Sequence, residues 1–215
     1  MRRDHRSLFL IAVAGNLLCW VGDVLLCVFP GHETVSGFTL SPAWANAPLW
    51  RFSLSALCGG VAMMGVLCGF YALYQLLRPT APISAKIVMI GGLLGCVPGS
   101  VMHMQCTSTA WIYARMGGTD AAMEIAEDYF MHHMPLFILC TVGLLMACLE
   151  LLRCVVLGKS SLPRWAAVFN IIILSAALNL LRPLVVVPGT MNLGGAGMFA
   201  GLYFCTAEKE GGTSR

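Results

Sequence analysis

Residues 99–135, GSVMHMQCTSTAWIYARMGGTDAAMEIAEDYFMHHMP, contain the end of one apolar segment, a charged connection and the start of the next apolar segment. His103 lies inside the first of these segments, and Gly117-Gly118 ends it. Four acidic residues follow in the connection, and two histidines close it. Ionisable side chains inside a membrane are costly, and they therefore point to function. This stretch predicts two membrane helices separated by a polar connection, with candidate site residues at the junctions.

The composition is typical of a membrane protein. Of the 215 residues, 58% are hydrophobic and 11% are charged, against about 25% charged in soluble domains. The mean hydropathy is +0.80. Basic residues in such a chain set its topology, so nucleic acid is not predicted as a partner. The ten cysteines form no CxxC pair and are predicted to be free thiols within apolar segments.

Six apolar windows are predicted to be transmembrane helices, which need about 20 residues each. They cover residues 8–29, 53–77, 87–113, 134–157, 164–182 and 190–206. The predicted fold class is therefore all-α, a polytopic transmembrane helical bundle of about six spans. It forms a single domain over residues 8–206, with tails at residues 1–7 and 207–215. The predicted location is the plasma membrane.

Lysine and arginine are unequally divided between the two sides of this bundle. If the N-terminus is inside, only three of the 13 basic residues fall outside: Arg51, Arg115 and Arg182. Cytoplasmic loops carry the excess of Lys and Arg in membrane proteins. Both termini are therefore predicted to be cytoplasmic.

The charged connection has the pattern of a further helix. Thr119 is a suitable N-cap. Acidic or histidine side chains then recur every four residues, at Asp120, Glu124, Asp128 and His132. This helix either lies at the membrane interface or lengthens the fourth span, with Pro135 bending the junction.

Asp23 in the first span and His103 in the third are predicted at similar depth in the outer half of the membrane. Asp23 needs a partner, because a charge at the centre of a lone helix costs about 2.5 to 3.5 kcal/mol. The candidate partners are Arg182, His103 and Arg51. An Asp-His couple binds metal or acts as a general base. The alternative is a structural pair that joins two helices. Asp23 and His103 form the candidate catalytic pair.

Polar residues on the outer side predict a ligand clamp. Arg51 and Arg182 suit a phosphate or carboxylate head group, which two planar guanidinium groups bind well. Asn179, one turn before Arg182, and Trp50, beside Arg51, complete the candidate ligand-binding set. The alternative is that both arginines extend to lipid phosphates without forming a site.

Nitrogen and oxygen donors in the same region suggest a metal site. The candidate ligands are His103, His132, His133 and Asp128, which zinc or iron accepts. No HExxH spacing supports this hypothesis. Asp128 with His132 is also a common surface pair on a helix.

Glycines recur at GxxxG spacing, at Gly65/Gly69, Gly91/Gly95/Gly99 and Gly197/Gly201. Small residues let helix backbones approach closely in lipid. These faces predict either a compact bundle or a homo-oligomer.

A pattern of short motifs extends over most of the chain: Gly22-Asp23 in the first span, Trp50-Arg51 before the second, His103 within a span, and Asn179 with Arg182 before a proline. This pattern resembles bacterial multi-pass integral membrane protein families of unknown function. The resemblance implies a fold and a location, and it carries no activity.

Together these features predict a polar pocket at the outer leaflet that binds, and in one version modifies, a lipid-like or amphipathic small molecule. His103→Ala is then expected to abolish binding and to leave the fold intact. A small proton-coupled transporter using Asp23 and His103 is one alternative, and a non-catalytic membrane subunit is another. Membrane lipid is the expected partner. The sequence identifies neither a substrate nor a reaction.

Overall fold

The computed structural model describes residues 4–29, 40–181 and 186–211. Its elements are α1 (Asp4–Cys27), η1 (Pro42–Asn46), α2 (Trp50–Leu77), α3 (Pro82–Arg115), α4 (Asp120–His132), α5 (Met134–Val156), η2 (Arg164–Phe169), α6 (Ile171–Leu180) and α7 (Thr190–Gly211), where η denotes a short 3₁₀ helix. None of these described residues forms a strand. The predicted all-α class is confirmed.

Four helices are long and apolar enough to cross a membrane, namely α1, α2, α3 and α5. They coincide with the first four predicted spans, and the apolar segments of these helices have 23 to 34 residues. A helix of about 20 residues spans the hydrocarbon core of a bilayer. These four helices indicate a membrane protein.

The fifth predicted span, residues 164–182, is wrong as one continuous helix. The structure divides its described part between η2 and α6, and α6 has 10 residues, which make a helix of about 15 Å, half the hydrocarbon thickness. Asn170 causes the break. Its backbone is extended, its side-chain oxygen accepts a hydrogen bond from the Ile172 amide at 3.0 Å, and its Nδ2 donates to the Cys148 carbonyl at 2.8 Å.

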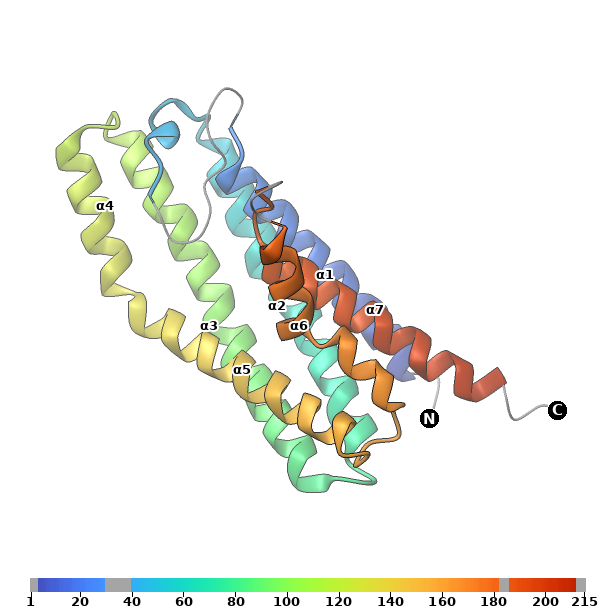
Figure 1. Ribbon diagram of the computed structural model, residues 1–215. Helices are drawn as coiled ribbons and strands as arrows, with labels where there is room; N and C mark the ends of the chain where they lie inside the picture. Colours follow the sequence, from blue (N-terminus) through green and yellow to red (C-terminus); the bar gives the residue numbers. More distant parts are fainter. Residues whose placement is uncertain (1–3, 30–39, 182–185, 212–215) are drawn as a thin grey trace.

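The sixth predicted span is contained in α7, which has 22 residues. Over the described residues, α7 is not one of the four helices that meet the length and apolarity required for a span. A total of six spans therefore stays a prediction. α1 begins and α7 ends in the lower half of Figure 1, where the connection from α2 to α3 also lies. The cytoplasmic position of this side stays a prediction too.

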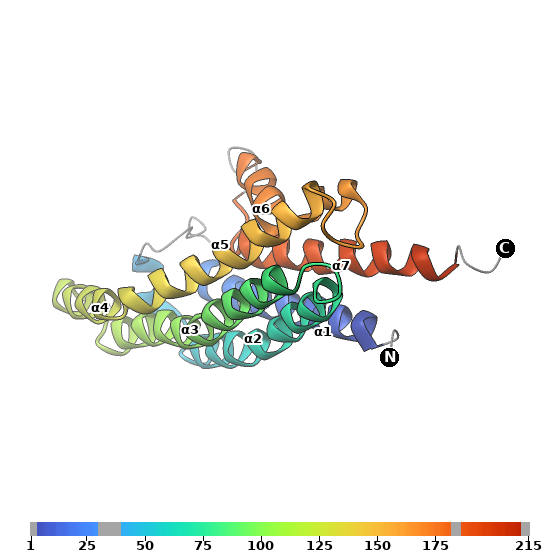
Figure 2. The same ribbon diagram turned by 90° about the horizontal axis from the view of Figure 1, so that it is seen from below.

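The helices pack in two layers. α2 packs between α1 and α3, α7 packs on α1, and α5 packs on α3. Figure 2 shows α1, α2 and α3 in one layer, with α5, α6 and α7 on one side of it. Aromatic side chains join the layers, because the Phe199 ring of α7 lies 6.1 Å from Phe9 and 5.7 Å from Phe70. The half of the bundle near the connection from α2 to α3 is thus filled by an apolar core.

α3 and α4 extend one end of the bundle. α3 has 34 residues and is about 51 Å long, which exceeds the roughly 30 Å of the hydrocarbon core. The predicted cap is confirmed, since Thr119 Oγ1 accepts a hydrogen bond from the Ala122 amide at 3.2 Å. α4 then runs back along α3, and only His133 separates it from α5, so the two form a bent rod (Figure 1).

The glycine motifs pack helices within the chain. A Cβ on Gly143 of α5 would lie 2.6 Å from the Gly95 nitrogen of α3. A Cβ on Gly65 of α2 would lie 3.3 Å from the Gly15 Cα of α1, and one on Gly201 would overlap the Phe169 ring. Each of the three predicted GxxxG faces is therefore covered by another part of the same chain. A homo-oligomer stays a prediction.

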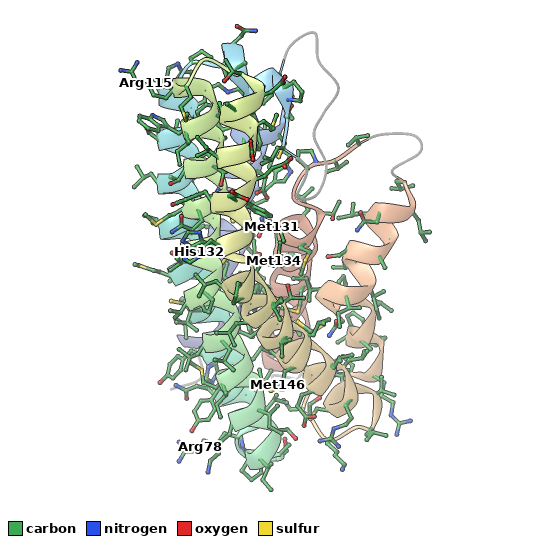
Figure 3. All side chains as sticks on the ribbon, turned by 90° about the vertical axis from the view of Figure 1, so that its left-hand side faces the viewer. Arg78, Arg115, Met131, His132, Met134 and Met146 are labelled. Atoms are coloured by element: carbon green, nitrogen blue, oxygen red, sulfur yellow. The ribbon has the colours of Figure 1, made fainter. Side chains whose placement is uncertain are left out.

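Two arginines mark the ends of the bundle. Figure 3 labels Arg115, at the end of α3, and Arg78, just after α2, at opposite ends. These are called the Arg115 end and the Arg78 end below.

Candidate functional site

The structure brings Asp23 of α1 and His103 of α3 together. Asp23 Oδ1 lies 3.7 Å from His103 Nδ1, and the two side chains are 17% and 9% exposed. Asp23 is four residues from the end of α1 at Cys27, so the pair lies in the half of the bundle nearer the Arg115 end. A separation of 3.7 Å exceeds the 2.7 to 3.2 Å of a good hydrogen bond. The two atoms therefore face each other within the distance of an ion pair but beyond that of a good hydrogen bond.

The opposite nitrogen of His103 is held by Ser55 of α2. Nε2 lies 3.1 Å from the Ser55 carbonyl and 3.3 Å from Ser55 Oγ. The Ser55 hydroxyl donates its hydrogen to the Gly22 carbonyl at 2.7 Å, so both partners of Nε2 act as acceptors. Nε2 consequently carries a proton, and in the neutral imidazole Nδ1 is then left as an acceptor.

Two glycines make room for the imidazole. A Cβ on Gly59 of α2 would overlap the His103 ring, and a Cβ on Gly22 of α1 would lie 2.9 Å from Nε2. The ring thus occupies a slot between α1 and α2 that no larger residue would leave open. Its orientation is fixed by packing on both faces and by the bonds to Ser55.

The start of α7 closes the other side of Asp23. Asn192 Nδ2 donates to Asp23 Oδ2 at 2.6 Å. Gly189 precedes α7 with a φ of +62°, and a Cβ there would overlap the Asp23 carboxylate. Its carbonyl accepts from the Asn192 amide at 2.9 Å, which sets the first turn of the helix. A carboxylate is stabilised near a helix N-terminus by the helix dipole.

The order Ser55, His103, Asp23 invites comparison with a serine hydrolase triad. In such a triad the Asp-facing nitrogen carries the proton and the Ser-facing nitrogen accepts one. Here the two nitrogens have the opposite roles, and the Ser55 side chain is fully buried and bonded to a backbone carbonyl. The Cys19 thiol, buried as well, lies 4.0 Å from the same Nδ1 that faces Asp23. Neither residue has the geometry of an activated nucleophile.

Arg51, predicted to bind a head group, is engaged by the end of α1. Its Nε donates to the Leu25 carbonyl at 3.1 Å, and its Nη2 donates to the Val28 carbonyl at 2.6 Å. The guanidinium also lies 4.4 Å from the centre of the Phe29 ring. Arginine at a helix C-terminus satisfies the last carbonyls and the helix dipole. The neighbouring Trp50 is 60% exposed.

The other two members of the predicted clamp are not assembled with Arg51 in the described structure. Asn179 Nδ2 donates to the Ser175 carbonyl at 2.8 Å and to Thr190 Oγ1 at 3.2 Å, and so joins α6 to the start of α7. Arg182 lies outside the described residues. The clamp as a ligand site stays a prediction.

The sequence of this chain matches one protein family. A family model matches residues 1–209. The chain belongs to DUF6796, a family of unknown function. No curated protein and no solved structure shows a significant match to it. The predicted resemblance to a family of unknown function is thereby confirmed, and DUF6796 brings no activity or substrate to the site.

The candidate metal ligands of this DUF6796 chain do not gather at one point. His133 Nδ1 bonds the Tyr129 carbonyl at 2.8 Å, and the Tyr129 hydroxyl bonds Gln105 of α3. These contacts fix the bend between α4 and α5. His132 and Asp128 are exposed on α4. Within residues 4–29, 40–181 and 186–211, no three His, Cys, Asp or Glu residues are placed to hold a metal ion. Zinc or iron binding stays a prediction.

Sequence reasoning missed three parts of this site: Ser55, Asn192 and the glycine slot. Asn192 gave a usable signal, because it is a polar side chain just after Pro188-Gly189 in an otherwise apolar segment. Ser55 gave none, since serine is common in membrane helices. Gly59 lies outside the GxxxG spacings and carried no signal either.

Proposed function

We propose that the protein is a multi-pass protein of the plasma membrane that binds an amphipathic, lipid-like small molecule at the Asp23–His103 site. One observation carries this proposal. With Asp23 ionised and His103 neutral, Oδ1 and Nδ1 are both acceptors that face each other at 3.7 Å, and the contact of Nδ1 with the Cys19 thiol is long, at 4.0 Å. A polar group that is buried without a strong partner is costly. The site is therefore complementary to a donor.

The head group that suits this gap carries a hydroxyl or an amine. Either supplies an N–H or O–H to two acceptors, whereas a phosphate or carboxylate supplies none. Arg51, a candidate to bind an anion, already bonds the carbonyls of α1. If the molecule is also modified, His103 Nδ1 is placed to take a proton from its hydroxyl, and Asp23 is placed to stabilise the imidazolium.

The position of the site supports binding from one side of the membrane. Asp23 lies toward the Arg115 end, while the Arg78 end is filled by the core around Phe9, Phe70 and Phe199. A ligand that reaches the site from the Arg115 end comes from a single leaflet. With the predicted topology that leaflet is the outer one.

A small proton-coupled carrier is the second candidate, and the same 3.7 Å gap favours it. One proton placed between Asp23 and His103 would satisfy both acceptors. Reconstitution in proteoliposomes separates the candidates, because a carrier gives a pH-dependent flux across the membrane and a one-sided binding site gives none.

The proposal is tested by the molecules that remain with the protein after purification in mild detergent. Extraction and mass spectrometry of wild type is expected to find one hydroxyl- or amine-bearing amphiphile per chain. Asp23→Asn and His103→Ala are expected to lose it. Ser100→Ala is the matched control, since Ser100 bonds the Gly60 carbonyl of α2 away from the site. Equal retention by all four proteins would remove the proposal.

A further inference from the structure

A groove lies between α2 and α3, separate from the Asp23–His103 site. Its volume is about 400 Å³, within the roughly 300 to 1,000 Å³ of small-molecule pockets. The lining residues are Phe52, Ser53 and Ala56 of α2 and Thr107, Ser108, Trp111 and Ile112 of α3. None of them contacts Asp23 or His103 through a hydrogen bond in the described structure. The groove is therefore a second place where a ligand can sit.

The lining suits an amphiphile with ester oxygens. None of the seven residues is charged, and Ala56, Ile112 and the Trp111 ring provide accessible apolar surface, with Phe52 buried beneath. Thr107 and Ser108 both donate to the Met104 carbonyl at 2.8 Å. The Ser53 hydroxyl and the Trp111 indole N–H make no hydrogen bond within the described part of the chain. These two donors match acceptor oxygens such as ester carbonyls.

A basic residue, Arg115, lies on α3 beyond the lining residues of the groove. Arg115 is seven residues after Ser108 and four after Trp111, so all three lie on one face of α3. It is about 10 Å along the axis from Ser108. Arg115 is exposed, and it makes no hydrogen bond or ion pair with any described residue. Figure 3 shows it at the end of the bundle, projecting outward.

From this arrangement we infer that the groove binds one phospholipid of the leaflet at the Arg115 end. Its acyl chain lies along Ala56 and Ile112, its ester oxygens meet Ser53 and Trp111, and its phosphate pairs with Arg115. A guanidinium binds phosphate with two parallel hydrogen bonds, which gives the head group a fixed place. The inference is independent of the function proposed for Asp23 and His103.

The test is a titration of delipidated protein with phosphatidylglycerol, followed by native mass spectrometry. Wild type is expected to bind one lipid saturably. Arg115→Gln removes a charge-assisted bond and is expected to weaken binding about tenfold. Ala56→Trp fills the groove and is expected to abolish binding.

Three control variants accompany the titration. Arg78→Gln removes a cation at the opposite end, Val61→Trp adds bulk at an exposed position of α2, and Asp23→Asn alters the other site. All three are expected to bind as wild type does. Ser108→Trp is a second groove-filling variant, used if Ala56→Trp lowers the unfolding midpoint.

Three results would each overturn the inference. The first is equal weakening by Arg115→Gln and Arg78→Gln, which means lipid bound without a specific site. The second is diacylglycerol binding as tightly as phosphatidylglycerol, which means no contact with the phosphate. The third is unchanged binding in the folded groove-filling variant.

Discussion

Replacing Asp23 with asparagine distinguishes a donor-binding site from a structural ion pair. In the wild type, Oδ2 of Asp23 accepts from Asn192 at 2.6 Å and Oδ1 faces His103 Nδ1 at 3.7 Å. In Asp23→Asn, the amide oxygen can keep the bond from Asn192, and the amide N–H can donate to His103 Nδ1. The variant thus supplies the missing donor from within the protein.

The expected effect on stability is positive. One added hydrogen bond contributes about 0.5 to 1.5 kcal/mol, and a buried charge is removed. For a chain of this size, 1 kcal/mol corresponds to a rise of about 2 to 4 °C in the unfolding midpoint. The assay is thermal unfolding of ligand-depleted protein in mild detergent, followed by tryptophan fluorescence.

The control is Asp23→Ala, which leaves Asn192 without its acceptor. Its unfolding free energy is expected to fall by about 1 to 3 kcal/mol. An equal loss of stability in Asp23→Asn and Asp23→Ala would refute the reasoning. That result means that a charged Asp23 holds a protonated His103, so the pair is a structural bridge between α1 and α3.

Four further variants test the site and the helix packing by thermal unfolding. Gly59→Ala puts a Cβ into the His103 ring and is expected to lower the free energy of unfolding by about 1 to 3 kcal/mol. Gly60→Ala is the control and is expected to be nearly neutral, because the nearest atom to its added Cβ is 3.6 Å away. Equal effects of the two variants would contradict the glycine slot. Arg51→Met is expected to cost about 1 to 2 kcal/mol through the lost carbonyl bonds of α1, and to leave the bound amphiphile in place, whereas a head-group role predicts loss of the amphiphile with little change in stability. Gly143→Ala is expected to cost about 1 to 3 kcal/mol, because α3 and α5 must separate, and an unchanged midpoint would contradict their close packing.

Much of the fold could be predicted because apolar length is a local property of the sequence. The first four predicted spans correspond to α1, α2, α3 and α5, and the capped helix after Thr119 is present. The interruption at Asn170 could not be predicted in this way. It depends on a bond to the Cys148 carbonyl of α5, which is visible only once the helices are packed.

The candidate site was predictable to the extent that a charge in lipid needs a partner. Depth gave Asp23 three candidate partners, Arg182, His103 and Arg51, and the structure places His103 beside it. The same argument could not show that Arg51 bonds the carbonyls of α1, because spacing does not reveal whether so long a side chain reaches a ligand or the backbone of a neighbouring helix. Asn192 is far from Asp23 in sequence, and only the return of α7 alongside α1 brings them together.

The central claim is tested most directly by measuring which nitrogen of the His103 ring carries a proton. ¹⁵N NMR of protein labelled at histidine, with His103 assigned by its absence in His103→Ala, reports which ring nitrogen carries the proton. The account predicts a protonated Nε2 and an unprotonated Nδ1 in ligand-free protein near neutral pH. It also predicts that the ¹⁵N chemical shift of Nδ1 changes when a donor binds. A protonated Nδ1 would contradict it, because His103 would then donate to Asp23 and no acceptor pair would be open to a ligand.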